Sequence, residues 1–248
     1  MQKPFKAVLF DLDGTAIPIA ANGVPTDRVK QAVRDAQNSA FVSVATGRDI
    51  AFCEYLLDIF AIQHLSILSG GTELYDPKTK QVVWEQALTQ SQIASVVALL
   101  RHEPYAMVDA QQQVVPVAQF AIPEKAHLLC IRAVDMDGAK RMKEILSALP
   151  EVVTHTVPSW TSGKFDFHVT HHNASKQHAL EELLQRENLV PAEVLVVGDS
   201  ANDLPLFAVG CFNVAMGNAS DALKEQADWI APDLAEDGLA IAIEKYLL

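Results

Sequence analysis

Acidic side chains follow an apolar stretch near the start of the chain. The segment "AVLFDLDGT" covers residues 7–15, and it places Asp11 and Asp13 two residues apart where a buried strand would reach the surface. A turn alone would explain these residue types. A pair of carboxylates at a strand end also suits catalysis, because one can attack an electrophile while the other transfers a proton. The other polar segments of the chain distinguish these two interpretations.

Three further segments carry polar groups next to apolar stretches or helix starts. Thr46 and Gly47 follow the stretch "FVSVA", and Lys176 lies at the predicted start of a helix. A later stretch, "VLVVG", is followed by the polar residues Asp199, Asn202 and Asp203. In an open parallel sheet, ligands bind beyond the carboxyl ends of the strands. We therefore expect these groups to meet at one edge of the sheet.

The chemistry of such an assembly is that of phosphoryl transfer. Several carboxylates repel one another, so a divalent cation is expected among them, and oxygen ligands with a partly hydrated shell suit Mg²⁺. The hydroxyl of Thr46, the ammonium of Lys176 and the backbone N–H groups at Gly47 suit phosphate oxygens. One carboxylate can then attack phosphorus to form an aspartyl-phosphate, and a second can protonate the leaving oxygen and activate water.

The first and last thirds of the chain contain the elements that would position these groups. Helices are predicted over residues 26–38, 49–60 and 175–188 from their apolar periodicity. Between them lie strand-like stretches that read as continuous apolar runs, including residues 6–10 and 193–200. Such runs, separated by helices, indicate a parallel sheet that is covered on both faces. The predicted fold class is therefore α/β.

The middle of the chain has a different pattern. Helices are predicted over residues 89–103 and 137–150, and the rest reads as successive strands with short gaps. Residues 151–158 and 164–172 are predicted to pair as a hairpin. Successive strands with few helices indicate an antiparallel sheet. Residues 85–170 are therefore predicted to form a second domain that is inserted into the first.

The composition of the chain limits its partners and its location. Half of the 248 residues are apolar, and the formal net charge is −12, so phosphate backbones are repelled and no nucleic-acid partner is expected. Cys53, Cys130 and Cys211 lie far apart without metal-binding spacing, which is typical of reduced thiols. The sequence lacks a signal-peptide pattern and a long apolar run. We expect a soluble cytoplasmic monomer or homodimer with no membrane partner.

Four short motifs give the chain a recognisable order. "DLDGT", "ATGR", the lysine of "SKQHAL" and "GDSAND" resemble, in sequence, the four motifs of the haloacid-dehalogenase superfamily of phosphatases. The inserted domain and the segment "VAMGNASDALKEQADWI" are similar to the Cof-like branch, which carries a large α/β cap. The resemblance implies a Rossmann-like parallel-sheet core of residues 1–84 and 171–248, with an inserted α+β cap over residues 85–170. The chain departs from the common pattern at residues 69–71, where "SGG" replaces asparagine-glycine.

The resemblance implies roles for the catalytic and phosphate-binding residues. Asp11 is the expected nucleophile, and Asp13 is the expected general acid and base. Thr46 and Lys176, together with the backbone at Gly47, are expected to hold the transferring phosphoryl group.

The resemblance also implies how Mg²⁺ is bound. Asp11 and Asp199 are expected to ligate the ion through their carboxylates, Asp13 through its backbone carbonyl, and Asp203 through water. Asn202, in the same segment, is expected to contact phosphate or to orient the motif lysine.

Arg48 and three histidines have no single assigned role. Arg48 can bind substrate phosphate or pair with an acid, and both interpretations stay open. His168, His171 and His172 lie near the return from the insert. We interpret them as solvated linker residues rather than metal ligands, because adjacent residues on a strand point to opposite faces.

Together these motifs favour a Mg²⁺-dependent phosphatase that hydrolyses a small phosphorylated metabolite through an aspartyl-phosphate. A sugar phosphate is the substrate class that the resemblance implies. The insert is expected to close over the site and select the leaving group.

Three other functions remain open. A sugar phosphomutase, or another phosphotransferase, would use the same intermediate. The relatively plain, uncharged sequence of the inserted domain does not suggest a second phosphate site. A receiver-like signalling module would use the phosphorylated aspartate as a switch. Neither Asp13 nor the inserted domain fits that function. An inactive relative would bind phosphate without reaction, yet every motif residue is present.

Overall fold

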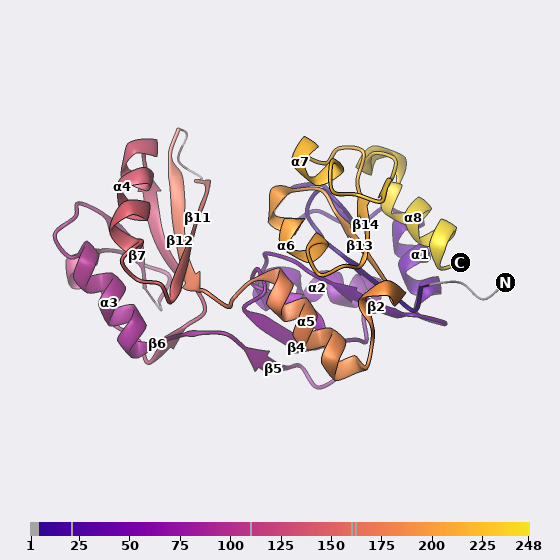
Figure 1. Cartoon of the computed structure of the whole chain (residues 1–248), viewed down its shortest axis with the longest axis horizontal. Helices are drawn as coiled ribbons and strands as arrows, with labels where there is room; N and C mark the ends of the chain where they lie inside the picture. The colour runs from indigo at the N-terminus through magenta and orange to yellow at the C-terminus, as the bar shows by residue number, and fades with distance from the viewer. Residues whose placement is uncertain (1–4, 21, 110, 160, 162) are drawn as a thin grey trace. The chain divides into compact units, whose positions relative to one another are not determined.

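The computed structural model describes residues 5–20, 22–109, 111–159, 161 and 163–248. The chain forms two compact units, which Figure 1 colours by residue number. The first unit combines residues 1–85 with residues 175–248, and the second consists of residues 86–174. Within the described ranges, no helix is long and apolar enough to cross a membrane.

Parallel strands form the main sheet of the first unit, in the order β15-β14-β13-β1-β2. Every residue of β1 and β13 is buried, so other elements cover both faces of the sheet. The α/β fold class predicted from the continuous apolar runs is therefore confirmed. The bounds of the strands are Ala7–Phe10 for β1, Phe41–Val44 for β2, Val194–Gly198 for β13, Phe212–Ala215 for β14 and Trp229–Ile230 for β15.

Three helices of the first unit, α1, α2 and α5, start at side chains that cap them. Thr26 accepts a hydrogen bond from the backbone N–H of Val29 at the start of α1, and Ser175 accepts one from His178 at the start of α5. α1 packs beside α8, and α5 packs beside α6. The helices are α1 (Asp27–Ala36), α2 (Ile50–Phe60), α5 (Lys176–Glu187), α6 (Leu204–Phe207), α7 (Asp221–Lys224) and α8 (Gly238–Tyr246). The 3₁₀ turns are η2 (Pro191–Glu193), η3 (Ala201–Asp203) and η4 (Leu234–Glu236).

A small antiparallel sheet extends the first unit, in the order β3-β4-β5. β3 (Ser66–Leu68) is linked to the end of β2 by a bridge from Ile67 to Ala45. β4 (Glu73–Asp76) and β5 (Gln81–Glu85) form a hairpin that the sequence analysis did not predict. β5 is mostly exposed, and its three apolar residues form one short run without the alternation that marks a half-buried strand.

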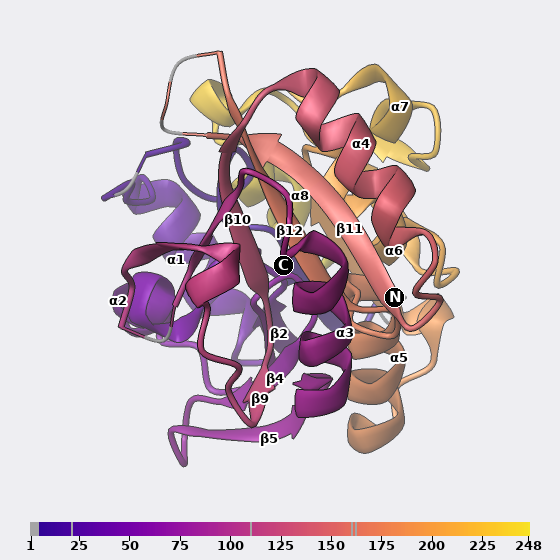
Figure 2. The ribbon, with the colours of Figure 1, turned by 90° about the vertical axis from the view of Figure 1, so that its left-hand side faces the viewer.

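The second unit is an antiparallel sheet in the order β11-β12-β10-β7-β8, with α3 and α4 on one of its faces (Figure 2). The predicted hairpin is present, because β11 pairs with β12 along its whole length. This unit has its own apolar core, which includes Met107, Ile131 and Phe167. The inserted antiparallel region is therefore confirmed. The strands are β6 (Leu88–Thr89), β7 (Ala106–Val108), β8 (Val114–Pro116), β9 (Lys125–Ala126), β10 (Leu129–Val134), β11 (Val152–Pro158) and β12 (Phe165–His171). The helices are α3 (Gln90–Leu100), the 3₁₀ turn η1 (Val117–Gln119) and α4 (Met136–Leu146).

Candidate active site

The ends of three neighbouring strands carry polar segments that the sequence analysis singled out. β1 lies between β13 and β2, and its last residue is level with Val197 and Val44. The residues that follow the strands therefore lie at one edge of the sheet: Asp11 after β1, Asp199 after β13 and Thr46 after β2. The backbone N–H of Asp11 donates to the carbonyl of Val197 at 3.0 Å, which continues the ladder to the aspartate.

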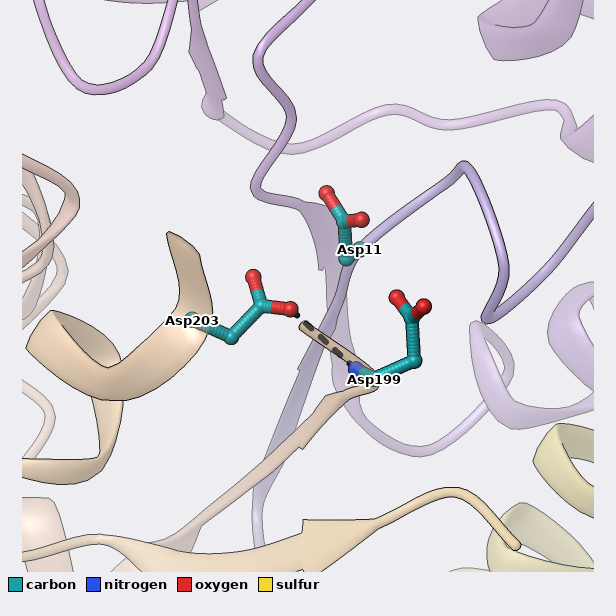
Figure 3. A group of neighbouring side chains, drawn as sticks. All are labelled: Asp11, Asp199 and Asp203. Atoms are coloured by element: carbon teal, nitrogen blue, oxygen red, sulfur yellow. Dashed lines mark hydrogen bonds between the residues drawn. The ribbon is translucent and has the colours of Figure 1, made fainter. Parts of the chain in front are cut away.

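Three buried carboxylates form an acid cluster at this edge (Figure 3). Asp11, Asp199 and Asp203 each offer one oxygen, and these oxygens lie within 4.8 Å of one another. Two of the aspartates follow strands, whereas Asp203 comes from the turn η3. Oxygen donors at this spacing fit a hard divalent cation. The cluster also needs positive charge, because buried carboxylates without a counter-charge strongly disfavour folding.

Lys176 supplies one positive charge to the acid cluster. Its side chain is 4% exposed, and Nζ donates to Oδ1 of Asp11 at 2.9 Å and to Oδ1 of Asp203 at 2.7 Å. Burial lowers the pKa of Lys176, but the charges of Asp11 and Asp203 outweigh this effect and raise the pKa above its ordinary value. Lys176 is therefore an ammonium group, and a single ammonium does not neutralise three carboxylates.

The raised pKa values of two aspartates in the cluster show the same shortage of positive charge. Burial raises the pKa of Asp11 to about 7, because the attraction of Lys176 offsets only part of the desolvation and the charge of Asp203 adds to it. Burial also raises the pKa of Asp199 to about 6, again with the charge of Asp203. A divalent cation would favour the ionised forms of both groups. The residues present therefore fit a metal site.

Asp203 holds the loop that carries Asp199. Its Oδ2 accepts hydrogen bonds from the backbone N–H groups of Asp199 and Ser200, both at 3.1 Å. Its other oxygen accepts from Lys176. Asp203 therefore joins the lysine to the Asp199 loop, and it is fully buried. Asn202, its neighbour in η3, is exposed, and Lys176 takes its side-chain contacts from Asp11 and Asp203 instead.

Asp13 lies in a different environment from Asp11. Its side chain is 30% exposed, and it forms a two-point ion pair with the guanidinium of Arg48. Nε of Arg48 donates to Oδ2 at 2.7 Å, and Nη2 donates to Oδ1 at 2.5 Å. The same guanidinium donates to the carbonyl of Ala20 at 2.8 Å and to that of Phe52 at 3.1 Å. The open question about Arg48 is thereby answered for this structure, in which Arg48 pairs with an acid.

The Thr46 loop follows β2 at the same edge. Thr46 is buried, its backbone N–H donates to the carbonyl of Ile67 at 2.9 Å, and its Oγ1 accepts from the backbone N–H of Arg48 at 3.1 Å. Gly47 lies between them and is exposed. The loop therefore presents the Thr46 hydroxyl and the exposed backbone of Gly47 beside the ends of β1 and β2, which suits an anion.

Comparison with known proteins identifies the family. Residues 8–119 and 107–243 match the family model described as haloacid dehalogenase-like hydrolase, and these ranges cover most of the chain. The chain belongs to the haloacid dehalogenase-like hydrolases. The chain is a phosphatase of this family, that is, a phosphomonoesterase.

Individual relatives are similar over almost their whole length. A 5-amino-6-(5-phospho-D-ribitylamino)uracil phosphatase of Bacillus subtilis is 26% identical over 98% of this chain and 96% of its own. A phosphoglycolate phosphatase of Archaeoglobus fulgidus is 25% identical over 98% and 97%. The solved structure of a haloacid dehalogenase-like hydrolase from Bacteroides thetaiotaomicron shares the fold, with a TM-score of 0.79, 19% identity and coverage of 97% and 99%.

The turn at residues 69–71 supports the site of this hydrolase, and the sequence analysis recorded it only as a departure from the family pattern. The backbone N–H of Ser69 donates to the carbonyl of Arg48 at 2.8 Å, and that of Gly70 donates to Thr46 at 3.0 Å. Gly71 has a φ of +97°, and a Cβ there would lie 2.1 Å from the carbonyl carbon of Ser175. Only glycine fits at this position, so the turn packs directly on the backbone that carries Lys176.

The histidines near the return from the insert differ in their surroundings. His168 lies within β12, opposite Cys130 of β10, and is only partly exposed, so its interpretation as a solvated linker residue is wrong. His171 and His172 lie at and just after the end of β12, with ring centroids 4.5 Å apart. Among the described residues, the group with metal-binding spacing is the acid cluster and contains no histidine.

Proposed function

We propose that this hydrolase is a Mg²⁺-dependent phosphatase that acts on a small sugar phosphate through an aspartyl-phosphate on Asp11. The observation that carries the proposal is the position of the Asp11 carboxylate. It lies within the acid cluster and accepts a hydrogen bond from buried Lys176 at 2.9 Å. A carboxylate between an ammonium and a cation site is next to two groups that attract phosphate oxygens.

Different residues of the chain carry out different parts of the reaction. An oxygen of Asp11 forms a bond to phosphorus while the bond from phosphorus to the leaving alcohol breaks, and Asp13 protonates that alcohol. Lys176 and Thr46, with the backbone at Gly47, bind the phosphoryl oxygens and orient them. Water then attacks phosphorus, Asp13 accepts its proton, and the bond between Asp11 and phosphorus breaks.

Mg²⁺ would be held by the carboxylates of Asp11 and Asp199 and by the Asp13 carbonyl. Asp203 would support the ion through water. When bound, the ion would offset the repulsion between the carboxylates and the anionic phosphate. The raised pKa values of Asp11 and Asp199 support this assignment, because both groups lack sufficient positive charge without it. Asn202 is exposed at the same edge, where a contact to phosphate remains part of the proposal.

The relatives support the choice of substrate class. Their names specify a phosphorylated ribitylaminouracil and phosphoglycolate, which are both small phosphate esters with polar leaving groups. The inserted unit of residues 86–174, with its own sheet and core, is proposed to select the leaving group. The cysteines at positions 53, 130 and 211 are free, which supports the expectation of a cytoplasmic protein.

Release of inorganic phosphate from a panel of phosphate esters tests the proposal. The panel contains sugar phosphates, phosphoglycolate and the ribitylaminouracil phosphate, each with Mg²⁺ and with EDTA. We expect turnover that EDTA stops and Mg²⁺ restores, with sugar phosphates preferred. Formation of a phosphosugar isomer without phosphate release would instead support a phosphomutase.

The Asp11→Asn variant tests the nucleophile in the same assay. We expect a loss of at least about 10³-fold in kcat, because an amide oxygen is a far weaker nucleophile. Asp58→Asn is the matched control, since Asp58 is exposed on α2 and the change in charge is the same. An Asp11→Asn enzyme as active as the control would rule out the proposed intermediate.

A further inference from the structure

Asn218 lies outside the four motifs, yet its side chain reaches the site. It belongs to the loop after β14 and is exposed. Its Nδ2 donates to the carbonyl of Gly14 at 2.8 Å, and its Oδ1 accepts from the backbone N–H of Leu234 at 3.0 Å. An exposed amide with both of its ends engaged holds two distant segments together.

The segment that Asn218 holds forms one wall of the acid cluster. Gly14 follows Asp13 directly, and a Cβ on Gly14 would lie 2.2 Å from Oδ2 of Asp199. The hydroxyl of Thr15 donates to Oδ1 of the same carboxylate at 3.1 Å. The backbone at Gly14 and the side chain of Thr15 therefore determine where the Asp199 carboxylate lies.

The loop of Asn218 also contacts the backbone of Asp199. The backbone N–H of Ser220 donates to the carbonyl of Asp199 at 2.9 Å. The loop is itself fixed to the C-terminal segment, because the N–H of Gly217 donates to the carbonyl of Pro232 at 3.2 Å. A single loop therefore binds the backbone of Gly14 and the backbone of Asp199.

We propose that Asn218 is a positioning residue for the cation site. Its amide holds Gly14 and Thr15 against Asp199, and with them the adjoining carbonyl of Asp13. The donor to Gly14 is an N–H group, so a carboxylate at position 218 would lose this bond while it kept the acceptor for Leu234. The inference rests on the proposed function in one respect, which is that the acid cluster binds Mg²⁺.

Calorimetric titration of the enzyme with Mg²⁺, without substrate, tests this role in three variants. Groups behind the direct ligands of a metal change its affinity by about 10- to 100-fold. We expect Asn218→Ala to weaken Mg²⁺ binding about tenfold, at the lower end of this range.

The Asn218→Asp variant tests the hydrogen bond to Gly14 independently of the hydrogen bond from Leu234. An added carboxylate by itself would strengthen cation binding. Weaker binding in Asn218→Asp therefore points to the lost N–H donor. Asn213→Ala is the matched control, because Asn213 lies earlier on β14 and its Nδ2 donates to the carbonyl of Phe207 at 3.1 Å. It should lower the melting temperature and leave the affinity for Mg²⁺ unchanged.

The outcomes separate this inference from the proposed function. A wild-type enzyme that binds no Mg²⁺ would contradict the proposed function. A wild-type enzyme that binds Mg²⁺, with Asn218→Asp binding equally well, would overturn the positioning role of Asn218 alone. Equal weakening by Asn213→Ala and Asn218→Ala would also overturn it, because the effect would then follow general stability.

Discussion

Asp11 and Asp13 are separated by one residue, yet they belong to two regions with opposite properties. The nucleophile region consists of Asp11, Lys176, Asp199 and Asp203, and all four side chains are less than a tenth exposed. The acid/base region consists of Asp13 and Arg48, and the Asp13 side chain is 30% exposed. The first region is held by buried contacts among three segments of the chain, whereas Asp13 in the second is held by the side chain of Arg48.

The difference corresponds to what each carboxylate has to do. A nucleophile must remain in one position relative to phosphorus, and a rigid buried setting provides this. A general acid that later acts as a base must exchange protons with the leaving group and with water, so it needs access to solvent. The two regions should therefore respond differently to mutation, to pH and to the choice of leaving group.

Among changes that leave the side chains of both regions in place, the largest expected effect comes from displacing Lys176. In Gly71→Ala, the new Cβ would lie 2.1 Å from the carbonyl carbon of Ser175 and 2.3 Å from the backbone nitrogen of Lys176. Because a shift of about 1 Å in a catalytic group can cost about 10²-fold, we expect kcat/KM to fall by about that factor. Steady-state kinetics and inhibition by inorganic phosphate measure the effect.

Gly70→Ala is the matched control for this change. Gly70 has a φ of +71°, so alanine there meets similar backbone strain, but no atom lies within 4 Å of the new Cβ. We expect a lower melting temperature with kcat/KM within about threefold of the wild type. Equal losses in both variants would show that the turn acts through stability rather than through Lys176.

The second prediction concerns pH and affects only the nucleophile region. Metal ligands must be ionised, and Asp11 and Asp199 have pKa values raised to about 7 and about 6. Both groups lose their protons as the pH rises from 6 to 8, so the affinity for Mg²⁺ should increase about 20-fold over that range. Titration calorimetry in two buffers should also detect proton release at pH 6, and a flat affinity would contradict the assignment.

The third prediction concerns the acid/base region. Arg48→Met removes the ion pair that holds Asp13, so proton donation to the leaving group should become less efficient. We expect the hydrolysis of an alkyl phosphate to fall about tenfold, and that of p-nitrophenyl phosphate about twofold, because p-nitrophenolate leaves without a proton. Equal losses for both esters would indicate that Arg48 binds phosphate instead.

Tyr55→Phe is the control for Arg48→Met. The Tyr55 hydroxyl accepts from Nη1 of Arg48 at 3.4 Å and donates to the carbonyl of Gly23 at 2.9 Å. Its removal changes the surroundings of Arg48 and leaves the pair with Asp13 in place. Both esters should therefore be hydrolysed at nearly the wild-type rate.

The sequence was sufficient for the parts of the fold that depend on local patterns. Continuous apolar runs predict β1 and β13, and capping residues such as Thr26 and Ser175 mark the helix starts. The rule that ligands bind beyond strand ends predicts the meeting of Asp11 with Asp199, and the structure shows both in the acid cluster.

Other features depend on contacts between distant segments, which no local pattern encodes. The exposed strand β5 has no apolar alternation, so its hairpin with β4 was not predicted. The sequence left two interpretations of Arg48 open, because a carboxylate and a phosphate are both anions that a guanidinium binds. The structure shows the pair with Asp13. The close approach of Gly71 to Ser175 and the bond from Asn218 to Gly14 depend on three-dimensional packing.

Direct detection of phosphate on Asp11 tests the central claim. Asp13→Asn should still form the aspartyl-phosphate from p-nitrophenyl phosphate, since that leaving group needs no proton, but it should hydrolyse it slowly for lack of a base. Acid quench followed by peptide mass spectrometry should then find close to one phosphate per chain on the peptide that contains Asp11. The double variant with Asp11→Asn should carry none. Phosphate on another residue, or release of p-nitrophenol without any covalent phosphate, would contradict the account.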